Sequence, residues 1–137
     1  MTDELPPLLG RGLRYLWAAP VSLVGCVLAS AAVATGGDAR VVDGVLEANG
    51  GVLGQLLPQL GIGMTPSAMA LGHVVVAVDA DTLEHTRAHE RVHVAQAERW
   101  GFLFPAAYLA ASAVIAWNGG DPYRDNPFEQ EARAGEA

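Results

Sequence analysis

The sequence contains no lysine, so its positive charge rests on arginine alone, with 8 basic residues against 15 Asp and Glu. The formal net charge of -7 argues against nucleic-acid binding, which requires a basic surface. The single cysteine, Cys26, excludes an intrachain disulfide and any metal site built from several cysteines. A metal ion in this chain would therefore have histidine and carboxylate ligands.

Charged residues are also scarce. They make up 17% of the 137 residues, against about a quarter in an average soluble domain, and the mean hydropathy is +0.25. The length suits one modest domain. Either its core is rich in small apolar residues, or part of the chain lies in lipid.

A short lead, residues 1–12, precedes a long apolar stretch. Tyr15 to Gly37 are 23 consecutive uncharged residues, enough to span the hydrocarbon core of a membrane. The aromatic rings of Tyr15 and Trp17 suit the membrane interface at one end of such a span. We therefore predict an N-terminal transmembrane helix within residues 1–37, with the membrane as a partner, ahead of a domain formed by residues 38–137.

Three other interpretations of this stretch compete. Ala32-Val33-Ala34 could be the cleavage site of a secretory leader, although acids near the N-terminus and the length of the stretch are atypical of one. Leu23-Val24-Gly25-Cys26 resembles a bacterial lipoprotein box, but apolar residues follow the cysteine where a polar segment is expected. The third alternative is an Ala-rich helix buried behind a soluble domain, because small residues such as Ser30 suit either kind of packing.

Two strand patterns follow the apolar stretch. Residues 40–51 indicate a hairpin, with turn residues at Asp43-Gly44 and Asn49-Gly50. Residues 71–78 are a β-branched run of strand length, and a stretch marked by glycine and proline, through Pro66, separates the two patterns. We expect these strands to form a small antiparallel β-sheet.

Three helical patterns complete the chain. Asp81, with an acid three residues later, resembles a capping box and predicts a helix from there to Trp100. A second, apolar helix is expected over residues 105–117, and Asn126 before Pro127 predicts the start of a short last helix. The predicted fold class is α+β, in which an N-terminal apolar helix and a small sheet precede these three helices.

The strongest chemical signal lies in the first of the three helices. His89 and His93 are four residues apart and leave the same face one turn apart, where two imidazole nitrogens can meet one Zn²⁺ ion. Glu90 points to an adjacent sector, so it can take a proton from a water molecule at the metal without being a ligand. This HExxH pattern predicts metal-assisted hydrolysis, usually of an amide bond.

A zinc site needs a third protein ligand, which four residues could supply. His85 extends the histidine stripe, but three successive turns cannot easily converge on one tetrahedral ion, so an exposed or supporting position is expected. His73 lies in the predicted strand, where a histidine is more often packed or hydrogen-bonded. Glu129 and Glu131 in the last helix complete the set, although Glu129 could instead close a capping box with Asn126.

Further polar residues could support such a site. Gln96 lies seven residues after His89 on the same side of the helix and could hold a ligand in place. Tyr108, Tyr123 and Arg124 could polarise a carbonyl group or stabilise an oxyanion.

These motifs resemble the gluzincin branch of the HExxH zinc metallopeptidases, in which a backing helix and a small sheet precede the motif helix and a later helix supplies a glutamate. The run Phe128-Glu129-Gln130-Glu131-Ala132 is similar to the glutamate motif of that branch. The resemblance implies that Glu129 is the third zinc ligand, with Glu131 as the alternative. Arg133 stands where the gluzincins often have a supporting acid. The stretch from Leu71 to Ala132 also resembles a group of small bacterial proteins with a His-Glu-x-x-His-Val-x-Gln helix and an Asn-Pro-Phe-Glu ending.

The resemblance implies a membrane-associated, zinc-dependent hydrolase with a peptide or protein substrate and with Glu90 as the general base. The alternatives are a zinc-binding module without catalysis and a small membrane protein without metal. A metal site constrains the topology, because a helix over residues 102–117 that crossed the membrane would separate Glu129 from His93. We therefore expect that helix to pack on the domain or to lie in the membrane interface.

Overall fold

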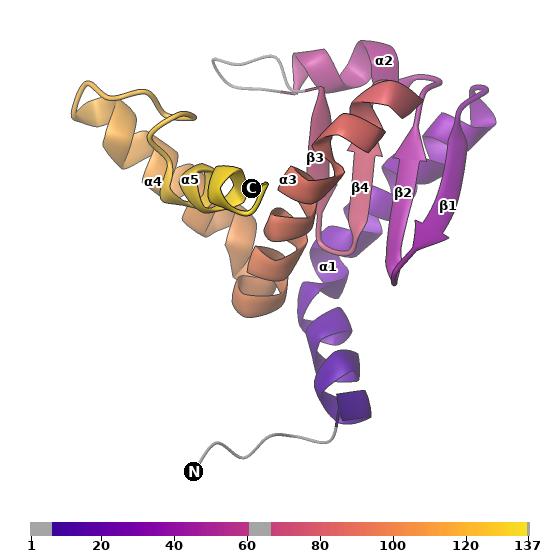
Figure 1. Ribbon diagram of the computed structural model, residues 1–137, viewed down its shortest axis with the longest axis horizontal. Coiled ribbons are helices and arrows are strands. Elements are labelled where there is room, and N and C mark those ends of the chain that lie inside the picture. The colour runs from indigo at the N-terminus through magenta and orange to yellow at the C-terminus, as the bar shows by residue number, and fades with distance from the viewer. Residues whose placement is uncertain (1–6, 61–66, 137) are drawn as a thin grey trace.

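Three layers make up the structure, a computed structural model that describes residues 7–60 and 67–136. Helix α1 (Pro7–Ala34) packs on one face of a four-stranded sheet, and α3 (Ala80–Trp100) packs on the other (Figure 1). The predicted α+β class is confirmed, and the helices and strands follow one another in the expected order. Part of the predicted lead and the end of the glycine- and proline-marked stretch lie outside the described residues.

The first hairpin is the one that the sequence predicts. β1 (Asp38–Val42) and β2 (Val45–Asn49) pair in antiparallel register around a two-residue turn. Asp43 and Gly44 have φ values of 49° and 79°. Tight hairpin turns of the primed type require positive φ at both central residues, which explains the Asp-Gly pair at this point.

The second hairpin corrects the prediction of one strand over residues 71–78. The chain turns at Gly72, whose φ is 63°, and forms β3 (Ala68–Leu71) before the turn and β4 (Val74–Ala77) after it. Glycine supplies the left-handed conformation that this turn requires, and the β-branched run begins only beyond it. His73 consequently lies in a turn and not in a strand.

The sheet is mixed, which corrects the prediction of a purely antiparallel sheet. Its strand order is β1-β2-β4-β3, and β2 pairs with β4 in parallel. The connection after β2 contains α2 (Leu53–Leu56) and η1 (Leu57–Gln59) and delivers β3 to the far edge of the sheet. β4 therefore lies between two strands and is buried on both faces, towards α1 and towards α3 in alternation. Burial on both faces explains why its sequence is continuously apolar.

Helix α1 meets the sheet through small residues. Ala18, Gly25, Ala29 and Ala32 are buried at helical spacing, and a Cβ on Gly25 would lie 2.5 Å from the Cβ of Val74. The helix is long and apolar enough to cross a membrane, by length and composition alone. One of its faces is covered by the sheet.

The N-cap of helix α3 lies two residues before the predicted one. The N-cap is Asp79, whose carboxylate accepts a hydrogen bond from the amide of Thr82 at 2.7 Å, so Asp81 is a first-turn residue. An aspartate caps the helix, as predicted, but the third residue after Asp79 is Thr82, so no glutamate closes a capping box. The helix ends at Trp100, as the sequence predicts.

Gly101 reverses the chain after α3. Its φ is 59°, and it begins the short turn η2 (Gly101–Leu103), which leads into α4 (Phe104–Trp117). A loop then returns the chain to α5 (Pro127–Ala134), which packs beside α3 (Figure 1). The end of the chain therefore meets the motif helix, as a three-ligand site requires.

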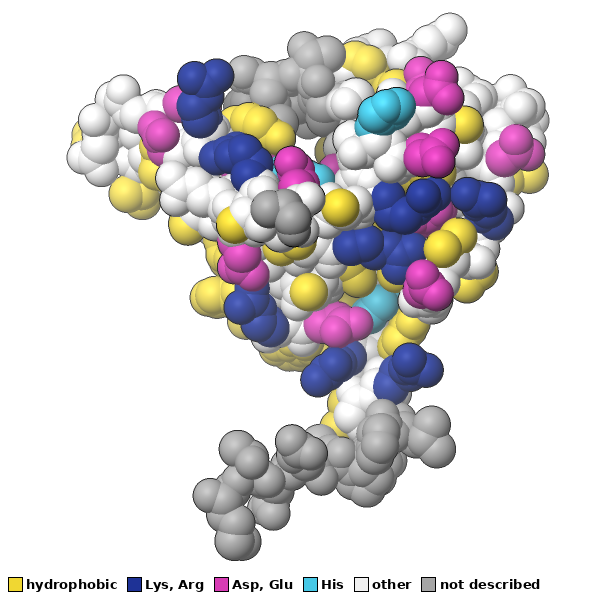
Figure 2. Space-filling model, viewed as in Figure 1, with side chains coloured by type: hydrophobic (Ala, Val, Ile, Leu, Met, Phe, Trp, Pro, Cys, Tyr) yellow, Lys and Arg dark blue, Asp and Glu magenta, His cyan; other side chains and the backbone are white. Residues whose placement is uncertain are grey.

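An ion-pair network fixes α3 against the sheet. The side chain of Glu47 in β2 is fully buried and accepts hydrogen bonds from Arg87 at 3.0 Å and from Arg91 at 3.1 Å. Burial raises the pKa of Glu47, but the hydrogen bonds from the two arginines outweigh it and leave the pKa below its usual value. Basic side chains gather on this face of the molecule (Figure 2). Because Arg87 and Arg91 flank His89, this network also sets the rotation of the motif helix.

We predict opposite effects of alanine at two glycines of α1. In Gly12→Ala the new Cβ meets nothing within 4 Å, so higher helix propensity alone raises the free energy of unfolding by about 0.5–1 kcal/mol. In Gly25→Ala the new Cβ collides with Val74, and overpacking lowers that free energy by about 1–3 kcal/mol. Thermal unfolding followed by circular dichroism measures both changes. An equal gain in stability at the two positions would contradict the packing of α1 on β4.

Candidate metal centre

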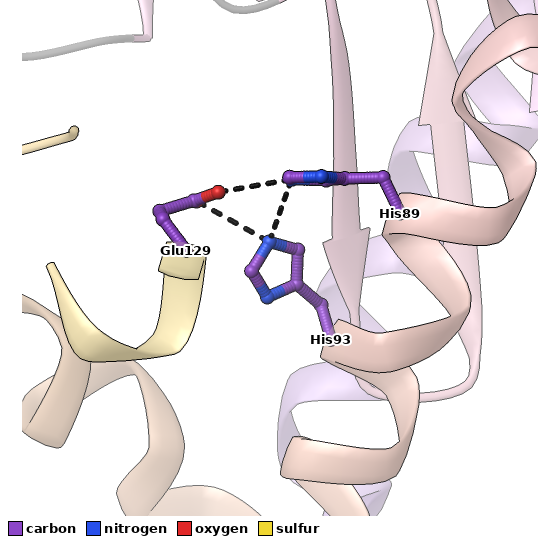
Figure 3. A group of neighbouring side chains, drawn as sticks. All are labelled: His89, His93 and Glu129. Atoms are coloured by element: carbon purple, nitrogen blue, oxygen red, sulfur yellow. Dashed lines mark hydrogen bonds and ion pairs between the residues drawn. The ribbon is translucent and has the colours of Figure 1, made fainter. Parts of the chain in front are cut away.

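Three donor side chains converge between α3 and α5 (Figure 3). His89 and His93 project from successive turns of α3, and Glu129 of α5 points its carboxylate at both imidazoles. Nε2 of His89 lies 2.9 Å from Oε2 of Glu129, and Nε2 of His93 lies 3.2 Å from Oε1. The two Nε2 atoms are 3.2 Å apart. His93 and Glu129 are buried, and His89 is largely buried.

These separations suit a single tetrahedral ion. Two donor atoms that each lie 2.0–2.1 Å from a tetrahedral zinc ion are about 3.4 Å apart. The donor atoms of the three side chains all lie within 4.8 Å of one another, so a small inward adjustment brings them to one ion. Two imidazoles and one carboxylate are also a donor set of catalytic zinc sites that keep a fourth position open. The residues present therefore fit a divalent metal such as zinc.

A separate acceptor holds the second ring nitrogen of each histidine. Nδ1 of His93 donates to Oε1 of Gln96 at 2.8 Å, and the amide of Gln96 is oriented by its own bond to the carbonyl of Phe128 at 2.9 Å. Nδ1 of His89 donates to Oε1 of Glu136 at 2.6 Å. With the proton held on Nδ1, a neutral imidazole turns the lone pair of Nε2 towards the centre of the group.

Glu136 is a contact that the sequence motifs do not indicate. The residue four after Glu129, where the gluzincin resemblance suggests an acid, is Arg133, and its guanidinium donates to the carbonyl of Arg124 instead. Glu136 lies beyond the end of α5, in the turn that follows Ala134, so no spacing in the sequence identifies its contact with His89. Its contact supplies the carboxylate beside His89 that Arg133 cannot.

The capping alternative for Glu129 is wrong. Asn126 caps α5 alone, because its side chain accepts from the amide of Phe128 at 2.9 Å. The amide of Asn126 donates to the carbonyl of Tyr123 at 3.2 Å and not to Glu129. The carboxylate of Glu129 is thereby available to the histidines, and it also accepts a hydrogen bond from the hydroxyl of Tyr108 at 2.7 Å.

The other three candidate ligands lie elsewhere. His85 is exposed, and its Nδ1 bonds the carbonyl of the preceding turn at 2.7 Å. His73 is buried between α1 and α3, where its ring stacks on Tyr15 with the ring centroids 3.8 Å apart. Glu131 is at the surface, 2.5 Å from a guanidinium nitrogen of Arg99.

Glu90 lies next to the donor group without belonging to it. It is buried, and its Oε2 atom has no hydrogen-bond partner among the described residues. Burial raises the pKa of Glu90, and the charges of His93 and His89 oppose that rise only in part. Leaving a buried carboxyl oxygen unpartnered is costly, and such perturbed acids concentrate at functional sites.

Glu129 controls the protonation of the group. Its hydrogen bond raises the pKa of His89 to about 9, against the opposing effect of burial. Burial raises the pKa of Glu129 itself, but the hydrogen bonds from His89 and His93 outweigh it and hold that pKa well below its usual value. The metal-free group is therefore a carboxylate paired with a protonated imidazole, and a metal ion would replace the proton.

Comparison of the chain with protein-family models, with curated proteins and with solved structures gave no match. The support for a metal centre comes from the HExxH pattern and from the convergence of His89, His93 and Glu129.

We predict that zinc uptake at pH 7 releases at least about one proton per ion, because His89, with a pKa of about 9, is protonated in the metal-free protein and the pKa of His93 is raised as well. Zinc affinity then increases with pH up to about 9. The raised pKa also stabilises the metal-free fold fully below pH 6.5, and that contribution is lost as the pH rises through about 9. Titration calorimetry in two buffers with different ionisation enthalpies measures the protons released. If zinc uptake released no proton and zinc affinity did not change with pH, the assignment of His89 as a zinc ligand would be contradicted.

Proposed function

We propose that the protein is a zinc-dependent hydrolase of the metallopeptidase type, which cleaves amide bonds in a peptide or protein. The convergence of the donor atoms of His89, His93 and Glu129 beside the buried acid Glu90 is the observation that supports this function most strongly. A structural metal site would need the three ligands and a fourth, but not a neighbouring buried acid with an unpartnered oxygen.

Each residue near the donor group has a chemical task. Bound zinc supplies Lewis acidity, which polarises the substrate carbonyl and lowers the pKa of water. Glu90 takes the proton from the attacking water and delivers it to the amine nitrogen as the carbon–nitrogen bond breaks. Burial raises the pKa of Tyr123 to about 12, and its hydroxyl is hydrogen-bonded to Glu129, so its phenol keeps its proton beside the donor group and is the candidate hydrogen-bond donor to the developing oxyanion.

An edge strand offers a binding place for a peptide. β3 pairs with β4 on one side, and the strand order leaves its other side without a strand partner among the described residues. The backbone amide of Ala70, within β3, interacts with the carboxyl group of Glu90. An extended peptide can pair with such an edge through main-chain hydrogen bonds, which would bring its amide groups towards the general base.

We predict that Glu129→Gln and His93→Ala each lower zinc affinity at least about tenfold, because each removes a ligand. Glu131→Gln is the matched control: it makes the same change in the same helix at a surface residue, and it leaves zinc binding unchanged. Elemental analysis after dialysis measures zinc per chain, with a value near one expected for the unaltered chain. If Glu129→Gln still binds zinc and Glu131→Gln does not, the third ligand is Glu131. An unaltered chain that takes up no zinc would rule the site out.

We further predict that Glu90→Gln keeps its zinc and lowers kcat/KM by about 10²–10⁴, the usual effect of removing a general base. Casein and a library of quenched fluorescent peptides are the assay substrates. If Glu90→Gln hydrolysed these substrates at an unchanged rate, Glu90 would not be the general base. A zinc-loaded unaltered chain without hydrolysis of any of these substrates would favour a metal-binding module over an enzyme.

A further inference from the structure

Helix α1 turns its small residues towards the protein and its large apolar residues outwards. Its contact with the sheet is made mainly by alanine and glycine, with Leu28 partly buried beside them, whereas most of its large apolar side chains are exposed. The exposed side chains include Leu13, Leu16, Leu23, Val24, Val27 and Val33. A helix on a domain surrounded by water has the opposite arrangement, because burial of large apolar side chains drives its packing. Small residues at the contact with the protein are typical of helices that pack in lipid.

Helix α4 also has its large apolar side chains on the outside. Its inner face carries polar groups that are hydrogen-bonded within the protein. Tyr108 donates to Glu129 at 2.7 Å, Ser112 donates to the carbonyl of Pro122 at 2.8 Å, and Asn126 donates to Ser112 at 2.8 Å. Its outer face is apolar. Exposed there are Leu109, Val114 and, with 89% of its surface accessible, Trp117.

The two helices meet at η2. Trp17 of α1 packs edge-to-face on Phe102 with the ring centroids 4.8 Å apart, and the absence of a side chain at Gly101 makes room for the Trp17 ring. Phe102 and Leu103 are themselves exposed at this junction. We call the exposed apolar residues of α1, η2 and α4 the outer apolar face. In Figure 1, α1 passes behind the sheet and α4 lies behind α5, whereas a cluster of charged side chains lies on the near face in Figure 2.

We propose that the protein docks on a lipid bilayer through the outer apolar face, with α1 and α4 lying along the membrane plane and not across it. The sheet packs along α1 from Ala18 to Ala32. For α1 to cross, strands with unpaired edge groups would have to enter the hydrocarbon core, where nothing replaces their hydrogen bonds with water. The 14 residues of α4 are about 21 Å long, short of the roughly 30 Å core.

The composition of the outer apolar face favours lipid over a second protein. Protein interfaces have a polar rim and about one hydrogen bond per 100–200 Å². The sequence has no charged residue from Tyr15 to Gly37 or from Phe102 to Gly120. All three tryptophans of the chain are exposed on α1, at the end of α3 and at the end of α4, and tryptophan is enriched where membranes meet water. Arg11 and Arg14, exposed near the start of α1, can contact lipid phosphates.

Flotation with vesicles of phosphatidylcholine and phosphatidylglycerol tests the docking. We expect the unaltered chain to float, and Val27→Glu on α1 and Ala113→Glu on α4 each to lower the partition coefficient about tenfold, since a charge in hydrocarbon is costly. Ala95→Glu, at an exposed helical alanine of α3, is the matched control and keeps full binding. The altered side chains are exposed, so circular dichroism and zinc content stay unchanged, which separates this test from that of the hydrolase.

Cysteine labelling tests the orientation. Cys26 is exposed on α1, and we expect vesicles to slow its reaction with a charged, membrane-impermeant maleimide at least about tenfold. In a Cys26→Ser background, Gly12→Cys and Ala34→Cys place a thiol near each end of α1. If α1 lies in the membrane plane, vesicles change the labelling rates of the two thiols alike, and labelling of only one of them from outside the vesicle would overturn the proposed orientation. Docking on lipid would be overturned if the unaltered chain did not bind vesicles. It would also be overturned if the chain formed a dimer that Ala113→Glu dissociates.

Discussion

The arrangement of the second half of the chain depends on one interaction, that of the Glu129 carboxylate with two imidazoles of α3. Gly101 ends the motif helix and reverses the chain, α4 carries it away, and the loop beyond returns it. Asn126 then starts α5 at the point that aims Glu129 at His89 and His93. The tail extends the same arrangement by bringing a second carboxylate to His89. Without this return, α3 would carry two histidines and no third donor.

The first half of the chain holds α3 in place. β4 is buried on both faces, so it contributes to two apolar clusters, one beneath α1 and one beneath α3. Glu47 adds a directional constraint, because its two arginine partners leave α3 on the side that faces β2 and thereby turn the histidines towards α5. The site side of the molecule is thus held by hydrogen bonds and charge. The side formed by α1 and α4 has apolar side chains facing outwards, as contact with lipid requires.

Local signals account for the features that the sequence predicts well. The HExxH helix, the apolar helix after it, the Asn126-Pro127 start and the Asp43-Gly44 hairpin each follow from spacing or turn chemistry within a few residues. The parallel pairing of β2 with β4 and the turn at Gly72 depend on where distant strands meet, which no local pattern contains. The same limit applies to the site, where the choice of Glu129 over a surface acid and the contact of Glu136 with His89 are set by the packing of α5.

Crystals of the zinc-loaded protein, measured on both sides of the zinc absorption edge, test the central claim most directly. An anomalous difference map is predicted to contain one peak about 2.0–2.2 Å from Nε2 of His89, Nε2 of His93 and a carboxylate oxygen of Glu129. The carboxyl group of Glu90 should lie near the peak without coordinating it. A peak held by His73, His85 or Glu131, or no peak among the three donors in crystals grown with excess zinc, would contradict the account.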